Sequence, residues 1–239
     1  MELDHLTNAI ESWGIDSFDR AHTGLPKRIF NLLRTCNEET TLSALGHFLK
    51  TGLDRGERVT LVCFDHPAYL LAGFKEHGFS FDDALKSEQF IYLYYKPWLS
   101  HSLNFSTNYQ PLIGEAKYLS KGNIGRIAFR NADVLFNLET YLLAESSAEK
   151  IMSSLNSGDC VVLGCYQGTE TPAHQLLDDV SKTCLRSYIE IKSAANGNHT
   201  NYELILHKFP LFHTKQRINL RLTRGLGFNS PALEFLKHG

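Results

Sequence analysis

Long apolar runs and basic tracts are both missing from the 239-residue sequence. No apolar run reaches the roughly 20 residues that cross a bilayer, and the first residues, MELDHLTNAIESW, are polar and acidic. Lysine and arginine number 24 against 26 aspartates and glutamates, which gives a formal net charge of −2. We therefore expect a cytoplasmic protein with neither a signal peptide nor direct membrane insertion, and the charge does not point to nucleic acid.

Metal and redox motifs are missing as well. The five cysteines are an odd number without a CxxC pair, and the eleven histidines are scattered without HExxH spacing. No GxSxG sequence marks a serine nucleophile. The pattern favours reduced, buried thiols over a metal or redox site, and we expect no metal and no cofactor.

What the sequence does contain is an alternation of apolar runs and helical patterns, with enough apolar residues (43%) for a sizeable core. Strands are predicted at 28–33, 59–64, 90–95, 125–129 and 160–165. Helices are predicted at 6–13, 40–53, 68–77, 112–119, 133–141, 144–155 and from 171 or 172 to 184. Residues 97–110 are expected to form a long loop.

The rhythm changes after residue 187, where three strand candidates at 188–191, 202–208 and 216–222 follow one another closely. Closely spaced strands favour antiparallel hairpins, whereas fully apolar runs such as VTLVCF favour parallel strands covered by helices. We therefore predict an α/β fold of three layers, with a mostly parallel central sheet and antiparallel C-terminal edge strands. Residues 1–22 would form a lead-in that packs on a single domain of residues 23–239.

The stretch from Ile29 to Leu53 is the centre of this pattern. An apolar run enters the polar turn RTCNEE, and a helical stripe follows it, with Thr40 or Thr41 expected to cap the helix. Strand, turn and helix in this order are the arrangement of a phosphate-binding loop.

The order of elements and several strings resemble the KaiC branch of the RecA-like P-loop ATPases. The strings are TGLPKRIFNLL, RTCNEETTL and FLKTGLDRGERVTLVCF, with YELILHKF and INLRLTRGLGF near the end. The similarity runs from about residue 23 to 228, and it is most specific around residues 48–64. It implies a RecA-like domain with a nucleotide cleft beside the phosphate loop.

The chemistry of that family is not kept. With Thr40 at the hydroxyl position of GxxxxGK[ST], Leu33 and Glu38 stand at the glycine positions and Glu39 at the lysine position. Two carboxylates there repel a polyphosphate, since one like-charge contact at ~4 Å costs on the order of 4 kcal/mol at an effective dielectric near 20. They suit the positive end of the helix instead.

The charge at the position that binds the metal ion in that family is also reversed. Arg130 follows the GRIAF strand where the resemblance implies a carboxylate, and Asp133 is expected only to start a helix. Asp65 and His66 stand where the family has a glutamate pair, and of its Lys-x-Arg only Lys208 is kept. We hypothesise a Glu39–Arg130 salt bridge; the alternative is that each charge is solvated.

Three functions follow from these observations. The first is a catalytically inactive scaffold or regulatory subunit, with an unidentified protein, an active relative or a second copy as its partner. The second is a small-molecule sensor in which Arg34, Arg130 and His66 meet an anion; the third is an NTPase with an atypical loop.

The candidate site residues follow from the same mapping. The degenerate cleft comprises Arg34, Thr35, Glu38, Glu39, Thr40, Asp65, His66 and Arg130. Lys208 and Trp98 are expected at an interface, and Asp178 with Asp179 at a solvated helix edge.

Overall fold

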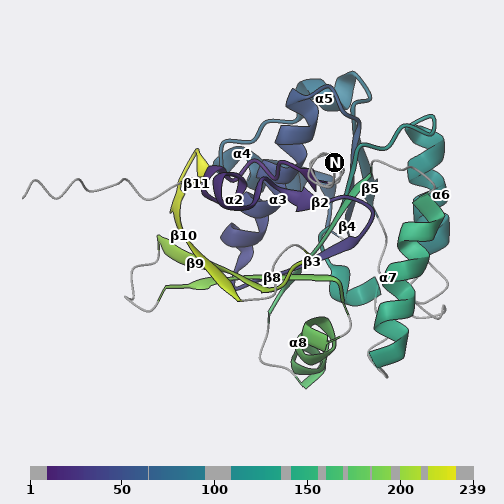
Figure 1. Ribbon diagram of the computed structural model, residues 1–239. Helices are drawn as coiled ribbons and strands as arrows, with labels where there is room; N and C mark the ends of the chain where they lie inside the picture. Colours follow the sequence, from purple (N-terminus) through teal and green to yellow (C-terminus); the bar gives the residue numbers. More distant parts are fainter. Residues whose placement is uncertain are drawn as a thin grey trace, which may run out of the picture.

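The structure is a computed structural model. It describes residues 10–63, 65–94, 109–135, 141–155, 160–168, 172–183, 185–194, 200–210 and 215–229. A nine-stranded sheet runs through it in the order β11-β10-β9-β8-β3-β7-β6-β4-β5 (Figure 1).

Six neighbouring strands form the parallel part of the sheet, because each pairs in parallel with its neighbours within this group. In chain order these are β3 (Phe30–Thr35), β4 (Val59–Cys63), β5 (Phe90–Tyr94), β6 (Arg126–Phe129), β7 (Val161–Gln167) and β8 (Ser187–Ser193). Most of their residues are buried, as the fully apolar runs predicted. The central strand β3 lies between β7 and β8.

The remaining strands form the antiparallel edge. β9 (Asn201–Lys208) pairs with β8, β10 (Gln216–Thr223) with β9, and β11 (Gly227–Asn229) with β10. This edge curls around α2 and α3 (Figure 1). The predicted mostly parallel sheet with antiparallel C-terminal edge strands is confirmed.

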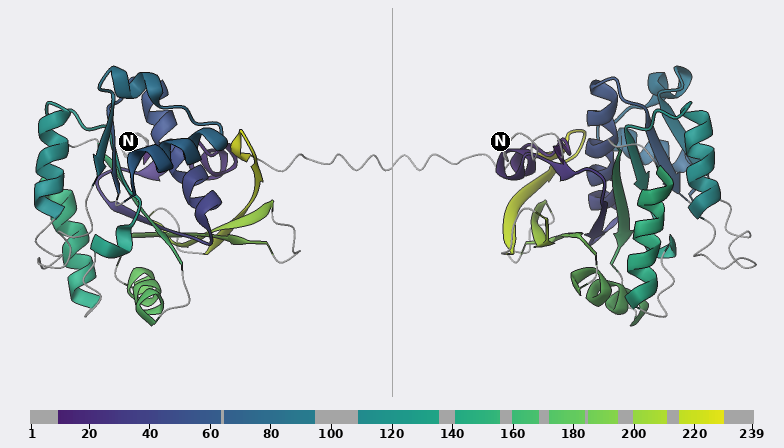
Figure 2. Two further views of the ribbon diagram at one scale, coloured as in Figure 1. Left: turned by 180° about the vertical axis from the view of Figure 1, so that it is seen from behind. Right: turned by 45° about the vertical axis from the view of Figure 1, so that its right-hand side comes forward.

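Helices cover both faces of the sheet (Figure 2). One face carries α3 (Glu38–Asp54), α4 (Pro67–Glu76) and the short α5 (Asp82–Lys86). The other face carries α6 (Tyr109–Leu119), α7 (Tyr141–Leu155), α8 (Pro172–Thr183) and the 3-10 helix η3 (Ala132–Leu135). The two apolar clusters on either side of the sheet give three layers. Within the described residues, no helix combines the length and apolarity that a membrane span requires.

Several predicted elements were wrong. Ile10–Glu11 is the short strand β1, paired with β2 (Leu25–Pro26), and the helix of this region is α2 (Asp16–His22), made of the polar DSFDRAH. Polar sequence forms the helix because its Phe18 and His22 are buried, while Asp16 and Arg20 are exposed.

Other differences are shifts and omissions. A helix was predicted at 133–141. The structure has the 3-10 helix η3 at the start of this range, and α7 begins at its last residue, Tyr141. The short elements α5 and β11 were not predicted. Most of the predicted loop 97–110 and position 184 lie outside the described residues.

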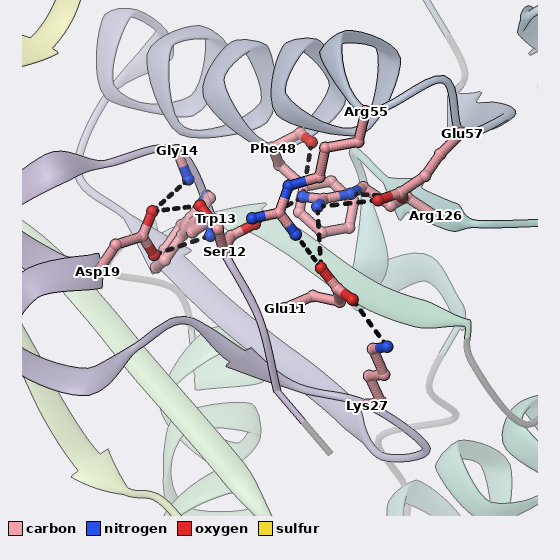
Figure 3. Close-up of polar contacts among 10 residues, drawn as sticks. All are labelled: Glu11, Ser12, Trp13, Gly14, Asp19, Lys27, Phe48, Arg55, Glu57 and Arg126. Atoms are coloured by element: carbon pink, nitrogen blue, oxygen red, sulfur yellow. Dashed lines mark hydrogen bonds and ion pairs between the residues drawn. The ribbon is translucent and has the colours of Figure 1, made fainter. Parts of the chain in front are cut away.

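The N-terminal segment is fixed to the sheet by Arg126, at the amino end of β6 (Figure 3). This side chain is 0% exposed. Its Nε donates to Glu57 Oε2 (2.8 Å), and its Nη1 donates to the carbonyls of Ser12 (2.7 Å) and Phe48 (3.1 Å). Gly52 leaves room for it, because a Cβ there would lie 2.7 Å from Arg126 Cδ.

Trp13 and Asp19 complete this junction (Figure 3). The buried indole of Trp13 donates to the Ala44 carbonyl of α3 (3.0 Å). The Asp19 carboxylate accepts from the backbone N–H groups of Trp13 (2.8 Å) and Gly14 (2.7 Å). Residues 10–26 therefore pack on the sheet and α3 through one buried polar junction.

Replacing Arg126 with Ala tests this junction. The change leaves the Glu57 carboxylate and two carbonyls without their donor, so we expect a loss of about 3–5 kcal/mol in the free energy of unfolding. Denaturant unfolding measures it. The control Arg20→Ala removes a side chain that is 80% exposed and should cost less than about 0.5 kcal/mol. Equal effects of the two changes would contradict the structural role of Arg126.

His47 lies where α3 meets the β10–β11 hairpin and the N-terminal turn. Its ring centroid is 4.9 Å from that of Phe79, edge-on, and 6.4 Å from that of Phe228, stacked. Burial lowers the pKa of His47 to about 4, although backbone groups of Phe228 and Gly14 and the charges of Asp16 and Asp19 act in the opposite direction.

This histidine predicts a loss of stability in mild acid. Between pH 6.5 and about 4 the unfolded state binds more protons at this position than the folded state, so stability falls as the pH falls. The gap between the two pKa values corresponds to roughly 3 kcal/mol. In denaturant unfolding at several pH values, His47→Gln and His47→Phe should both reduce this slope, by up to about 1.4 kcal/mol per pH unit. Slopes equal to that of the unaltered protein would show that His47 does not carry the effect.

Candidate functional site

The link between β3 and α3 contains only two residues, Cys36 and Asn37. Leu33 pairs with Cys165 on one side and Ile189 on the other, inside the sheet. The positions that the resemblance assigns to a phosphate loop are therefore part of a strand and a helix cap. A two-residue link has no curved run of backbone N–H groups that could surround a phosphate.

Asn37 and Thr40 close the N-terminus of α3 as a reciprocal capping box. Asn37 Oδ1 accepts from the Thr40 backbone N–H (2.9 Å), and the Asn37 N–H donates to Thr40 Oγ1 (3.2 Å). The Thr40 hydroxyl also donates to the Asn37 carbonyl (2.8 Å). Thr40 or Thr41 was predicted to cap the helix, but the N-cap is Asn37, and Thr40 is its partner at the third helical position. Thr40 was also predicted as a remnant of the metal-binding hydroxyl, and its hydroxyl is used in this capping box.

Thr35 is likewise used within the fold. Its hydroxyl donates to the Tyr166 carbonyl (3.2 Å), and its Oγ1 lies 2.6 Å from Thr41 Oγ1. Both threonines are buried, so they join β3, β7 and α3.

Arg130, at the carboxyl end of β6, forms the charged centre of the site. It is 8% exposed, and its Nη2 donates to both carboxylate oxygens of Glu38 (2.5 Å each). Its Nη1 forms an ion pair with Asp65, which follows β4. Three elements that are distant in sequence thus meet around one guanidinium, and the two carboxylates are about one third exposed.

The hypothesis of a Glu39–Arg130 salt bridge is wrong, because Glu38 takes that place. Neighbouring residues on an α-helix point about 100° apart, so only one of two adjacent glutamates can face β6. Glu39 is exposed and lines a separate pocket with Glu76, His77 and Arg224.

The thiols near this centre are not poised for chemistry. Burial raises the pKa of Cys63 to about 11, although a hydrogen bond with Tyr92 acts to lower it. Burial raises the pKa of Cys165 to about 12. Both thiols stay protonated near neutral pH, and a protonated thiol is a poor nucleophile and a poor metal ligand.

Arg34, at the end of β3, is held in a second polar cluster. Its Nη1 forms an ion pair with Asp178 of α8 and lies 3.5 Å from Glu190 Oε1 of β8. Burial acts to lower the pKa of Arg34, but the nearby Asp178, Tyr188 and Glu190 outweigh it and raise the pKa. Each of the two arginines of the predicted cleft, Arg34 and Arg130, therefore forms ion pairs with two carboxylates.

Asp178 was predicted at a solvated edge, and this was wrong. It is 7% exposed and accepts hydrogen bonds from the hydroxyls of Tyr166 and Tyr188 (2.9 Å for Tyr188). The signal was present in the sequence, since Leu177, Asp178, Val180 and Ser181 form one helical stripe and all are buried. Asp179 is exposed, as predicted.

Glu190 and His207 extend the second cluster to β9. His207 Nε2 lies 2.7 Å from Glu190 Oε2, and the His207 ring stacks on Tyr188 with a centroid distance of 4.9 Å. The hydrogen bond with His207 lowers the pKa of Glu190, which opposes the effect of burial. The sequence offered no signal for this pairing, because it depends on the register between β8 and β9.

The other predicted site residues have local roles. His66 is the N-cap of α4, where its Nδ1 accepts from the Ala68 N–H (3.3 Å). Lys208 Nζ donates to the Thr183 carbonyl at the end of α8 (3.1 Å). Trp98 lies outside the described residues.

Comparison with known proteins adds no assignment to this geometry. No family model matches the chain, and a search of the curated proteins finds no match.

Arg130→Gln tests the charged centre. The change leaves the Glu38 and Asp65 carboxylates facing each other without a cation, so we expect a loss of about 1–3 kcal/mol in unfolding free energy. Denaturant unfolding measures it, and the double change Arg130→Gln with Glu38→Gln should recover part of the loss. Strictly additive losses would contradict the pairing.

Proposed function

We propose that the protein is a catalytically inactive, RecA/KaiC-like protein that acts by binding other proteins, as a scaffold or regulatory subunit. The observation that carries the proposal is the ion pairing of Arg130 with Glu38 and Asp65 at the carboxyl end of the parallel strands. Ligands of open α/β sheets bind at that end of the strands. Among the described residues at that end, Arg130 and Arg34 are engaged by carboxylates of the chain itself.

Electrostatics opposes a nucleoside triphosphate there. Glu38 and Asp65 already neutralise Arg130, and Asp178 with Glu190 neutralise Arg34. A polyphosphate would have to displace these carboxylates or face their negative charge. Stabilisation of the transferring phosphoryl group is most of the catalysis in this chemistry, and it needs free cations.

Exposed aromatic side chains at the same end support a protein-binding role. Tyr69 on α4 and Tyr94 at the end of β5 are exposed, and the His66 ring lies 6.0 Å from that of Tyr94. Tyrosine is enriched in protein interfaces. RecA-like domains commonly associate side by side, so the proposed partner is an active relative or a second copy of this chain.

A nucleotide-binding experiment tests the loss of phosphate chemistry. At about 1 mM Mg²⁺-ATP, a site with a Kd near 10 μM would stabilise the protein by about 2.7 kcal/mol, which raises Tm by roughly 5–10 °C. We expect no change in Tm and no ATP turnover. A Tm increase, or a turnover that Thr40→Ala abolishes, would overturn the proposal.

The protein-binding half of the proposal needs its own experiment. Affinity purification of the full chain from its native cell, followed by mass spectrometry and light scattering of the complex, should return a stoichiometric protein partner. The exposed pair Tyr69→Ser and Tyr94→Ser should reduce its recovery, whereas Tyr118→Ser, a tyrosine that is 82% exposed on α6, serves as the matched control. Absence of any partner and a monomeric mass would overturn this half.

A further inference from the structure

A pocket of about 400 Å³ lies between α3, α4 and the β9–β10 pair, outside the charged centre of Arg130. Its lining comes from three distant parts of the chain: Glu39; Glu76 and His77; Thr200, Leu222 and Arg224. This volume falls within the roughly 300–1,000 Å³ that is usual for small-molecule sites.

The walls of the pocket are held by backbone contacts. The Gly225 N–H donates to the Glu76 carbonyl at the end of α4 (3.1 Å), and the Leu222 N–H donates to the Thr200 carbonyl (2.8 Å). Gly78 has φ of +87°, and a Cβ there would lie 2.0 Å from the Gly225 oxygen. Only glycine allows α4 and the β10–β11 turn to meet so closely, so the position of the two walls is built into the fold.

Acidic and basic side chains line this pocket, and they do not form ion pairs with one another. Within the described residues, neither Glu39 nor Glu76 forms an ion pair within 4.0 Å, and Arg224 forms none either. The acidic and basic groups are thus held apart around one cavity. All three residues are exposed, so their charges are solvated in the free protein and are open to a ligand that carries both charges.

His77 provides the second, independent indication of a ligand. It is 9% exposed, and its Nδ1 has no hydrogen-bond partner in the described part of the structure. Buried polar atoms almost always have a partner, so an unsatisfied one at a pocket wall is the kind of group that a ligand satisfies. Burial lowers the pKa of His77 against the influence of Glu39 and Glu76, which keeps the imidazole neutral near pH 7.

We propose that this pocket binds a small zwitterion of the α-amino-acid class. Its ammonium group lies against Glu39 and Glu76, its carboxylate is held by Arg224, and His77 forms a hydrogen bond with one end. Leu222 supplies the apolar part of the floor. The site goes beyond the proposed function, and neither depends on the other.

Two other ligand classes fit the pocket less well. A metal ion would need three ligands gathered at one point, and the described residues hold no such group of histidine, cysteine, aspartate and glutamate. A polyanion such as a nucleotide would face two carboxylates and a single arginine. The charge pattern matches a ligand with one charge of each sign.

Isothermal titration calorimetry of the full chain tests the proposal with the twenty standard L-amino acids, first in pools and then singly. We expect at least one amino acid to bind. The single change Arg224→Gln and the double change Glu39→Gln with Glu76→Gln should each weaken that binding about ten- to hundredfold. The matched controls are Arg20→Gln and Asp83→Asn, which lie on the exposed surface away from the pocket and should leave binding unchanged.

The chemical class is tested by two analogues of the best ligand, the amine without the carboxylate and the acid without the amine. Each should bind at least about tenfold more weakly than the amino acid. The proposal is overturned if no amino acid produces binding heat up to about 10 mM, if the pocket variants bind as the unaltered protein does, or if either analogue binds equally well. None of these outcomes changes the Mg²⁺-ATP result, so failure of this site and failure of the proposed function are distinguishable.

Discussion

A buried guanidinium must have carboxylate or carbonyl partners, and this constraint holds the sheet to the segments around it. Arg126 at one end of β6 joins the N-terminal segment and α3 to the body of the protein. Arg130, just beyond the other end, joins the start of α3 to Asp65, which lies two residues after β4. Arg34, which is only partly buried, joins β3 to α8 and β8. Each arginine gathers elements that are distant in sequence, and each is largely neutralised where it lies.

The same constraint shapes what the carboxyl end of the sheet can do. Cations at that position could receive an anion, but Arg130 and Arg34 are each engaged by two carboxylates. The two-residue link before α3 removes the backbone cradle as well. These two features are the basis of the proposed role in binding other proteins.

The geometry of one helix turn separates the two acidic residues at the start of α3. Glu38 points toward Arg130 and completes its ion pairs, whereas Glu39 lines the pocket of His77 and Arg224. Adjacent residues of similar chemistry thus serve a structural centre and a candidate ligand site. The pocket itself exists because the turn between β10 and β11 meets the end of α4, where Gly78 and Gly225 allow close contact.

The sequence by itself determined the order of the main strands from β3 to β10 and of the longer helices between them, because hydrophobic periodicity is a local property. It missed the short elements β1, α2, α5 and β11. It also determined that the turn after β3 carries carboxylates where the resembled ATPases carry glycine and lysine. The tertiary structure alone decided that Arg130 meets Glu38 and Asp65, and that His207 reaches Glu190. The physical reason is that a charge selects its partner by direction and distance, and these depend on helix rotation, strand register and the packing of segments far apart in the chain.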